Sequence, residues 1–532
     1  MTGLSSLWPA LSSLPLIPSE SAPFGPLSPL HEYIIAHAED ITLSNAVYAL
    51  GIPFAPLALQ AFLLQREGTR VWRGAIAVLG LVLILRAWTG YRMTQPELNA
   101  YNNGLGVTYL HLMGKYVEFG LLRGPIVDPY TAKGRHWLVS MFDLCINSRW
   151  VGLGDVVLDQ KPSRASKTSG TKGTKGTKGT NGTNGTNGTN GTNDTNGTDE
   201  MNGTKDMNGR MNGHMPGVDE TNGPKGDVEV KVKGDGDMVD VAAGVDQSRW
   251  LPMPTVRRTR SQATLRHARL TATRYLVLDT MLCLLRSLGK STIGRPDAPP
   301  NATHIFIHKN VYTFLPRSTL SVQVHPWVVL LISELCIGTG VWQALSLGYH
   351  FFAMLCVGSG LYEVDAWEVD FFDQWWKADS LLELWGRGWH QIFRHHFLFY
   401  SALLLRTLGL NPRGGMLLPL VFIQSGALHA LGELAMSPTP DPSLIFLFFV
   451  GSGLGCAAEI LFRRITGRRV RGWTGWIWTW TVTLTMASWA PQVWFDAGMG
   501  GSHLLPVSPW SPGSIIAEAM RSWVIDVKEA TQ

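Results

Sequence analysis

SLLELWGRGWHQIFRHHF (380–397) is followed, after an apolar run, by QSGALHALGEL (424–434). His390 and His429 lie in these two segments among apolar and aromatic residues, and His429 falls inside an expected membrane helix. Ionisable side chains at membrane depth are rare because their burial is costly, so they usually mark function. A histidine in such a place can act as a base near neutral pH. The two segments therefore predict an enzyme that works on a lipid-soluble substrate.

The composition is that of a membrane protein diluted by a polar insert. Hydrophobic residues make up 45% of the 532 residues, yet the mean hydropathy is only +0.06. Many of the 21 tryptophans lie near the ends of apolar runs, as in the aromatic belt of membrane proteins. The net charge is only +5, and the basic residues form no groove or stripe, which argues against nucleic-acid binding.

The apolar runs predict an all-α polytopic membrane protein with roughly eight or nine transmembrane helices, since one span needs about 20 mostly apolar residues. The runs that support this count are 46–65, 72–89, 265–288, 325–361, 397–410, 416–436, 443–462 and 473–495. We expect 325–361 to form two helices that break near Ser346–Gly348. The run 397–410 is short, which favours a half-membrane helix. The run 104–122 contains Lys115 and Glu118, so we expect it to lie on the membrane.

The middle of the chain changes composition abruptly. Residues 161–246 are of low complexity, with TKG and then TNG triplets, and their first half lacks large apolar residues. Such a segment cannot bury a core, so it should be disordered. The arginine-rich loop 462–472 is expected to be cytosolic by the positive-inside rule, and we expect the insert to be cytosolic too.

The chain is therefore expected to divide into five parts. These are an irregular N-terminus (1–45), N-terminal membrane helices with an interfacial segment (46–152), a low-complexity disordered insert (153–250), a membrane core (251–500) and a C-terminal tail (501–532).

Two motifs resemble those of the membrane-bound O-acyltransferase superfamily, and of its wax-synthase-like branch in particular. In that branch a segment of the form S-L-x-x-F-W-G-R-R-W-H precedes a membrane helix that carries H-x-x-G. The corresponding segments here are SLLELWGRGWH (380–390) and HALG (429–432). The chain departs from the pattern at Leu384, where Phe is usual, and at Gly388, where Arg is usual. The resemblance is best over about 270–500, which makes 251–500 the expected acyltransferase core.

The resemblance implies roles for the two histidines in acyl transfer from a thioester to a hydroxyl. Such a reaction needs a base for the alcohol proton, and we assign this role to His429. It also needs donors for the oxyanion that develops on the thioester carbonyl. His390 stands where many relatives carry Asn, and we expect it to polarise the carbonyl or to orient the substrate. Without this context, a lone histidine on an apolar helix would more often be a structural hydrogen-bonding group.

Substrate-binding residues are expected close to the histidines. Trp385 and Trp389 are four residues apart, so a helix would place one above the other as the wall of a tunnel. Trp375 and Trp376 resemble the aromatic F-Y-x-D-W-W element of the larger acyltransferases. The tryptophans alone could equally be interfacial anchors.

Charged and polar residues near the motif are expected to play different parts. Arg387 and Arg394 are candidates for the phosphates of coenzyme A, because arginine forms strong charge-assisted bonds to phosphate. His395 and His396 are expected to be solvated or interfacial. No metal site is expected, because the histidines have no acidic or cysteine partners at ligand spacing. A solvated loop face is expected from the acids that precede the motif, namely Glu363, Asp365, Glu368, Asp370 and Asp373.

The resemblance implies a multi-pass membrane enzyme, expected in the endoplasmic reticulum, that uses acyl-CoA as co-substrate, holds no bound cofactor and esterifies an apolar acceptor. Some members of the branch make wax or steryl esters from long-chain acyl-CoA. Others, in filamentous fungi, acetylate terpenoid or meroterpenoid hydroxyls in secondary-metabolite pathways, and we favour this second kind, with acetyl-CoA as donor. The alternative from another class is a non-enzymatic transporter or lipid-binding protein. Transporters tend to show inverted repeats with paired broken helices, and the sequence shows no such symmetry.

Overall fold

The structure is a computed structural model of the whole chain. It describes residues 24–122, 125–126, 130, 134–148, 258–287, 311–313, 321–323, 326–412, 414–488, 494, 497–506, 508–516 and 519. The expected disordered insert (153–250) lies outside the described residues.

The N-terminal part is helical from residue 28 onward. Its helices are, in chain order, α2 (Ser28–His37), η2 (Val47–Gly51), α3 (Ala55–Leu64), α4 (Arg70–Gly90), α5 (Asn99–Leu121) and α6 (Trp137–Ile146). The helix α2 corrects the expectation that residues 1–45 are irregular. Between η2 and α3 the chain turns at Pro53, as expected of a run that contains prolines.

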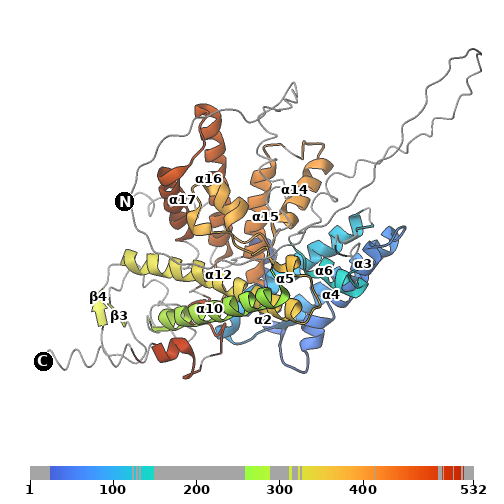
Figure 1. Cartoon of the computed structure of the whole chain (residues 1–532), viewed down its shortest axis with the longest axis horizontal. Helices are drawn as coiled ribbons and strands as arrows, with labels where there is room; N and C mark the ends of the chain where they lie inside the picture. The colour runs from blue at the N-terminus through green and yellow to red at the C-terminus, as the bar shows by residue number, and fades with distance from the viewer. Residues whose placement is uncertain are drawn as a thin grey trace, which may run out of the picture. The chain divides into compact units, whose positions relative to one another are not determined.

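The C-terminal part begins with two long helices that lie side by side. They are α10 (Arg260–Ser287) and α12 (Pro326–Gly358), and they pack along one another (Figure 1). The helices that follow are α13 (Leu381–Glu383), η8 (Leu384–Gly388), α14 (Arg394–Thr407), α15 (Leu417–Gly432), α16 (Pro442–Thr466) and α17 (Gly472–Ala487).

Strands are few and short among the described residues. The strand β1 (Glu39–Asp40) pairs in parallel with β2 (Tyr91–Arg92), and β3 (Val311–Thr313) pairs antiparallel with β4 (Ser321–Gln323). The all-α fold class predicted from the sequence is confirmed: the chain is an α-helical polytopic membrane protein.

The helix α12 differs from the expectation of two helices. It runs unbroken for 33 residues, through the expected break at Ser346–Gly348. Ser346 is fully buried, and a break there would leave backbone groups without partners in apolar surroundings. A continuous helix satisfies those groups internally, which explains why one glycine does not end it.

The helix α5 also differs from expectation, because it lies in the protein core and not on its surface. It packs against α3, α4, α14 and α15, and it buries Tyr109, Tyr116 and Phe119. Its two charged residues have partners inside. Lys115 Nζ donates to the Leu144 carbonyl at 2.7 Å, and Glu118 is bound by a histidine of α14. Burial of charge is tolerated when it is paired in this way.

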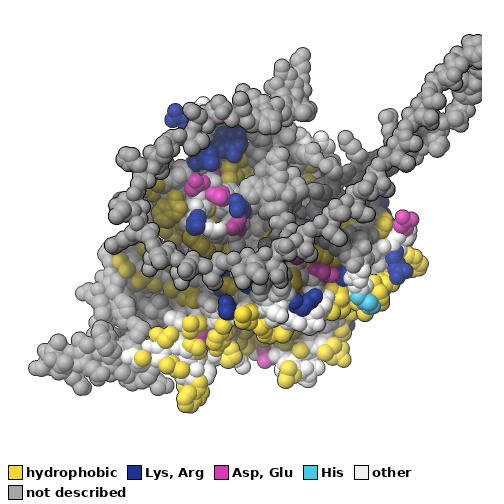
Figure 2. Space-filling model, viewed as in Figure 1, with side chains coloured by type: hydrophobic (Ala, Val, Ile, Leu, Met, Phe, Trp, Pro, Cys, Tyr) yellow, Lys and Arg dark blue, Asp and Glu magenta, His cyan; other side chains and the backbone are white. Residues whose placement is uncertain are grey.

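Five helical segments of the described residues are long and apolar enough to cross a membrane. They are Val47–Leu64, Arg70–Gly90, Leu330–Gly358, Leu417–Ala435 and Pro442–Thr466. Many of their apolar side chains are exposed, as expected of surfaces that face lipid. Hydrophobic side chains cover much of the lower part of the face seen in Figure 2. The helix α14 has 14 residues, which gives a length of about 21 Å and falls short of a full span.

The helices α5 and α15 cross at two glycines that permit very close contact. A Cβ on Gly106 would lie 2.4 Å from the Gly432 carbonyl oxygen, and one on Gly432 would lie 2.6 Å from Val107 Cγ2. Small residues allow membrane helices to approach this closely. Gly432 is the glycine of the H-x-x-G motif, so its packing fixes the helix that carries His429, three residues earlier.

Candidate active site

His429 lies on α15 with its ring against the aromatic side chain of the next helix. The rings of His429 and Phe449 stack, with centroids 4.3 Å apart and an angle of 26° between their planes. His429 Nδ1 is 2.8 Å from the carbonyl oxygen of Ser425, one turn earlier on α15. A carbonyl oxygen can only accept, so Nδ1 must carry the proton and Nε2 must hold the lone pair. Within the described part of the chain, the ring of His429 makes no hydrogen bond through Nε2.

His390 lies in the connection between η8 and α14, inside a ring of aromatic side chains. Its ring centroid is 5.8 Å from that of Phe372, 5.9 Å from that of Trp389 and 5.9 Å from that of Phe393. Its Nδ1 is buried and has no hydrogen-bond partner among the described residues. Burial, and secondarily the neighbouring His429, lower the pKa of His390 to about 3, so its imidazole is neutral at neutral pH.

Phe393 brings the two histidines together. Its ring lies 5.9 Å from His390 and 6.4 Å from His429, nearly perpendicular to both. Residues from a loop and from a membrane helix, 39 positions apart in the sequence, therefore lie on one aromatic side chain. The two histidines that the sequence singled out thus contact the same phenylalanine ring.

The segment before His390 does not form the continuous helix through Trp385 and Trp389 that the sequence predicted. The helix η8 ends at Gly388, and Trp389 has extended backbone, so Trp385 and Trp389 do not lie on one helix. Their rings still meet, with centroids 6.4 Å apart. A Cβ at Gly388 would lie 3.0 Å from the Cα of Trp375, so glycine at this position allows the two backbone segments to pack closely.

The four tryptophans predicted to bind substrate differ in the side chains that their rings contact. Trp375 and Trp389 lie 5.6 Å apart, and Trp385 contacts Phe449, whose ring stacks on His429. These three line the aromatic surroundings of the histidines. Trp376 packs on Trp342 of α12, as Trp375 also does, but among the described residues its ring contacts neither Trp385 nor Trp389.

A residue that the sequence reasoning missed anchors this segment to α16. Glu459 accepts hydrogen bonds from the backbone N–H groups of Leu381 and Leu382, at 2.7 and 3.1 Å, and from Trp478 Nε1 at 2.9 Å. The first N–H groups of a helix have no partner within it, and a carboxylate satisfies them well. The sequence carries one signal for Glu459: it is an acidic residue inside the apolar run 443–462.

A cavity of about 260 Å³ lies beside His390. Phe372 joins the two, because it lines the cavity and its ring contacts that of His390. The lining residues are Glu368, Val369, Asp370, Phe371, Phe372, Asp373, Gly386, Arg387, Gln391 and Arg394. The two arginines predicted to bind coenzyme A phosphates therefore both line this cavity, which Phe372 connects to His390. Arg387 forms an ion pair with Asp373.

The acids before the motif are not simply a solvated loop face, which corrects the sequence prediction. Glu368 is buried, and Arg258 Nη1 lies 2.5 Å from its Oε2. Glu363 forms an ion pair with the buried Arg135. Asp370 Oδ2 lies 3.3 Å from Nε2 of His350, a fully buried histidine of α12. Each partner comes from a distant part of the sequence.

His395 and His396 are buried, contrary to the prediction that they are solvated or interfacial. Both lie in the first turn of α14. His395 Nε2 is 2.6 Å from Glu118 Oε1 on α5, so the pair joins the two helices. A Cβ on Gly114 of α5 would clash with the ring of His396, so that ring packs directly on the α5 backbone. In the described part of the chain, no group of three or more histidines, cysteines or acids has the arrangement of a metal site.

The fold and the site together define a class: an α-helical membrane protein with two histidines among aromatic side chains, and with a cavity near one of them that is lined by two arginines. Residues 367–451 match the model of the Membrane bound O-acyl transferase family. This segment of the chain, which holds both histidine motifs and all the residues that line the cavity, is therefore similar to that family.

Curated relatives of this chain are named acetyltransferases. Acetyltransferase spyB of Aspergillus fumigatus is 32% identical over 121 residues, which cover 22% of this chain and 20% of spyB. Acetyltransferase eriL of Hericium erinaceus is 26% identical over 223 residues, covering 37% of this chain and 56% of eriL. Acetyltransferase aurG of Calcarisporium arbuscula is 29% identical over 184 residues, which cover 31% of this chain and 44% of aurG. The chain thus spans at most 56% of the length of these relatives. No solved structure matches it.

Proposed function

We propose that this protein is an O-acetyltransferase that moves the acetyl group of acetyl-CoA to a hydroxyl of a terpenoid or meroterpenoid in secondary-metabolite biosynthesis. The observation that carries the proposal is the hydrogen bond from His429 Nδ1 to the Ser425 carbonyl, 2.8 Å long, which leaves Nε2 as a base in an aromatic pocket. The acyltransferase family of residues 367–451 supports the reaction class, and the names of the relatives support the acetyl group.

In this proposal His429 handles the proton of the acceptor. Its Nε2 takes the proton from the acceptor hydroxyl as the oxygen attacks the carbonyl carbon of the thioester. The Ser425 carbonyl holds the ring orientation and stabilises the imidazolium that forms. When the tetrahedral intermediate collapses, the carbon–sulfur bond breaks, and the same imidazolium returns its proton to the leaving thiolate of coenzyme A.

His390 supplies the second part of the proposed chemistry. Because its pKa is lowered to about 3, it is a neutral imidazole and can donate one N–H to the oxyanion on the former thioester carbonyl. The aromatic rings of Phe372 and Phe393 on either side limit access of water. A donor in such a dry site is worth more than the same donor in water.

The remaining residues of the pocket are proposed to hold the substrates. Arg387 and Arg394 would bind phosphates of acetyl-CoA, and the side chains of Trp375, Trp385 and Trp389 would contact the apolar acceptor. We place the protein in the endoplasmic reticulum as a multi-pass enzyme that takes its acyl-CoA from the cytosolic side.

Turnover by isolated membranes tests the proposal. Membranes that contain the protein, and matched membranes without it, receive acetyl-CoA or palmitoyl-CoA with hydroxylated terpenoids, sterols and fatty alcohols, and mass spectrometry reads the esters. The proposal predicts acetyl esters of terpenoids above background. Long-chain wax or steryl esters would instead identify the alternative acyltransferase, and background levels with every pair would contradict the enzyme class.

A further inference from the structure

The wall of the cavity beside His390 carries more negative than positive side chains. Residues 368–373 form a continuous part of the wall and include Glu368, Asp370 and Asp373, whereas the lining residues contain only two arginines, Arg387 and Arg394. If these acids were uncompensated, the cavity would repel a ligand with phosphate groups. The charge that balances them therefore decides what the cavity can bind.

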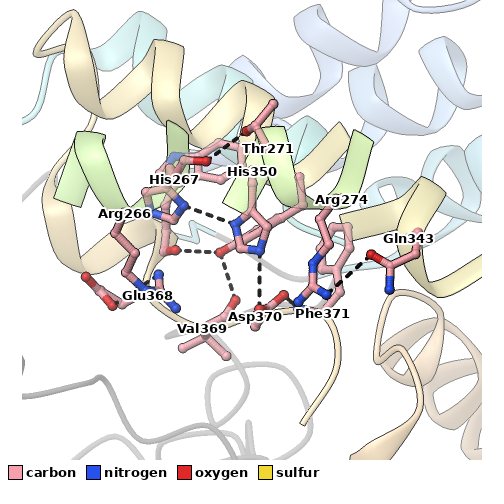
Figure 3. A network of polar contacts seen from close by, with 12 residues as sticks. Arg266, His267, Thr271, Arg274, Gln343, His350, Glu368, Val369, Asp370 and Phe371 are labelled. Atoms are coloured by element: carbon pink, nitrogen blue, oxygen red, sulfur yellow. Dashed lines mark hydrogen bonds and ion pairs between the residues drawn. The ribbon is translucent and has the colours of Figure 1, made fainter. Parts of the chain in front are cut away.

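The acids of the wall are engaged by cationic or hydrogen-bonding groups. Arg387 pairs with Asp373 within the cavity lining. On Asp370, burial alone would raise the carboxyl pKa, yet His350, whose Nε2 lies 3.3 Å from Oδ2, and the Phe371 N–H hold this pKa below its usual value. The carboxylate of Asp370 thus stays charged but is bound from the side of α12, as Figure 3 shows.

Glu368 is compensated by two arginines at the N-terminal end of α10, one just before the helix and one within it. Arg258 Nη1 lies 2.5 Å from Glu368 Oε2, and Arg266 Nη1 lies 3.6 Å from the same oxygen. The Glu368 side chain is only 3% exposed, so its charge is screened little by solvent and depends on these partners. Figure 3 shows Arg266 and Glu368 at one end of a polar network that reaches Asp370 and Arg274 at the other.

The α10 arginines are well suited to compensation because they approach from outside the cavity. Neither Arg258 nor Arg266 is among the residues that line it. Their guanidinium groups can therefore neutralise Glu368 without occupying the space of a ligand. Arg274 extends the same side of α10: its guanidinium lies over the Trp342 ring, at 4.6 Å, and donates to Gln343 Oε1 at 3.3 Å.

We propose that Arg258 and Arg266 are specificity-determining residues, which neutralise Glu368 in the cavity wall and so make the cavity accept the phosphate groups of the acyl donor. The inference rests on the proposed function, because it takes the donor to be a coenzyme A thioester. It extends the candidate site to α10, which lies outside the segment that matches the family model.

A rescue experiment tests the assignment on the full-length protein purified in detergent. The variant Arg258→Gln/Arg266→Gln removes both compensating charges, and adding Glu368→Gln removes the charge that they compensate. Isothermal titration with desulfo-CoA gives the Kd of each variant, and ester formation gives KM for acetyl-CoA and kcat. Arg269→Gln, a change at an exposed arginine of the same helix, is the matched control.

We expect the double variant to weaken desulfo-CoA binding and to raise KM by about tenfold, with kcat little changed. The triple variant should return to within about twofold of wild type, and Arg269→Gln should equal wild type. The conservative variant Arg258→Lys/Arg266→Lys keeps the charge and should bind almost normally. It also guards against a loss that comes only from misfolding.

Three results would overturn the inference: wild-type affinity in the double variant, no recovery in the triple variant, or no binding of desulfo-CoA by the wild-type protein. If the wild type binds desulfo-CoA but forms no ester with any acceptor, the proposed function fails. In that case the Kd values of the variants still decide the role of the α10 arginines.

Discussion

Two histidines of this protein, His395 and His429, have opposite surroundings. His395 is bound at 2.6 Å by the carboxylate of Glu118, which ties α14 to α5. His429 has a backbone carbonyl on Nδ1 and the rings of Phe449 and Phe393 around it, and Nε2 makes no hydrogen bond to a described residue. A buried ion pair is costly to break and serves structure, whereas a neutral imidazole with an open nitrogen can accept a proton. The comparison teaches that the partner of a buried histidine, and not its burial, indicates its role.

The largest effect is expected from removal of the open imidazole. His429→Ala should lower kcat for ester formation by about a thousandfold, within the range that a general base contributes, at an unchanged protein level. Product formation in membranes, normalised to protein, measures it. Ser425→Ala is the matched control, because it keeps the backbone carbonyl that orients His429. Equal activity of His429→Ala and wild type would make His429 a packing residue like His395.

Removal of the Glu118 carboxylate, the partner of His395, should lower the stability of the protein. Glu118→Gln leaves His395 buried without its charged partner, so we expect a loss of about 3 kcal/mol in the free energy of unfolding. The kcat of the protein that remains folded should stay within a few-fold of wild type. Thermal unfolding in detergent, together with activity per folded molecule, separates the two effects. A normal Tm with abolished turnover would contradict the structural role of the Glu118–His395 pair.

The role of His390 is tested by two substitutions, one of which keeps an N–H donor while the other removes it. His390→Ala should lower kcat by about a hundredfold, as expected for the loss of one oxyanion donor. His390→Asn keeps an N–H donor and should recover much of that loss. Steady-state kinetics at saturating acetyl-CoA reads both variants. If Asn were no better than Ala, hydrogen-bond donation by His390 would be excluded.

The smallest expected effect is on the pH dependence of stability. The folded pKa of His390 is about 3, below the usual value near 6.5, so the unfolded state binds more protons between these values. The contribution of His390 to stability is therefore fully present above pH 6.5 and is lost as the pH falls toward 3. We expect the Tm in detergent to fall less steeply from pH 7 to pH 5 in His390→Asn than in wild type. Parallel curves would contradict the burial of a neutral imidazole.

The sequence allowed the helical membrane fold to be predicted and pointed to the two histidines, because both signals are local. Apolar runs identify helices by their length, and the motifs around His390 and His429 are short. The proximity of the two side chains follows in the structure from Phe393, which contacts both.

Pairings between distant residues could not be predicted from one sequence. Glu118 and His395 are 277 positions apart, and Arg258 and Glu368 are 110 apart. Charged residues in weakly apolar runs resemble surface residues until their partners are known. For this reason the run that forms α5 was expected on the membrane surface, and His395 was expected to be solvated or interfacial. The unbroken α12 was missed for a related reason, because its continuity depends on burial against α10 and not on Gly348.

The most direct test of the account is the activity of His429→Gln in the same membranes as wild type. Glutamine keeps a donor that can reach the Ser425 carbonyl but has no basic nitrogen, so it separates proton abstraction from helix packing. With acetyl-CoA and an accepted terpenoid, the account predicts a wild-type Tm and less than about 1% of wild-type ester formation, as the loss of a base requires. Retention of more than about a tenth of the activity would contradict the role of His429 as the base.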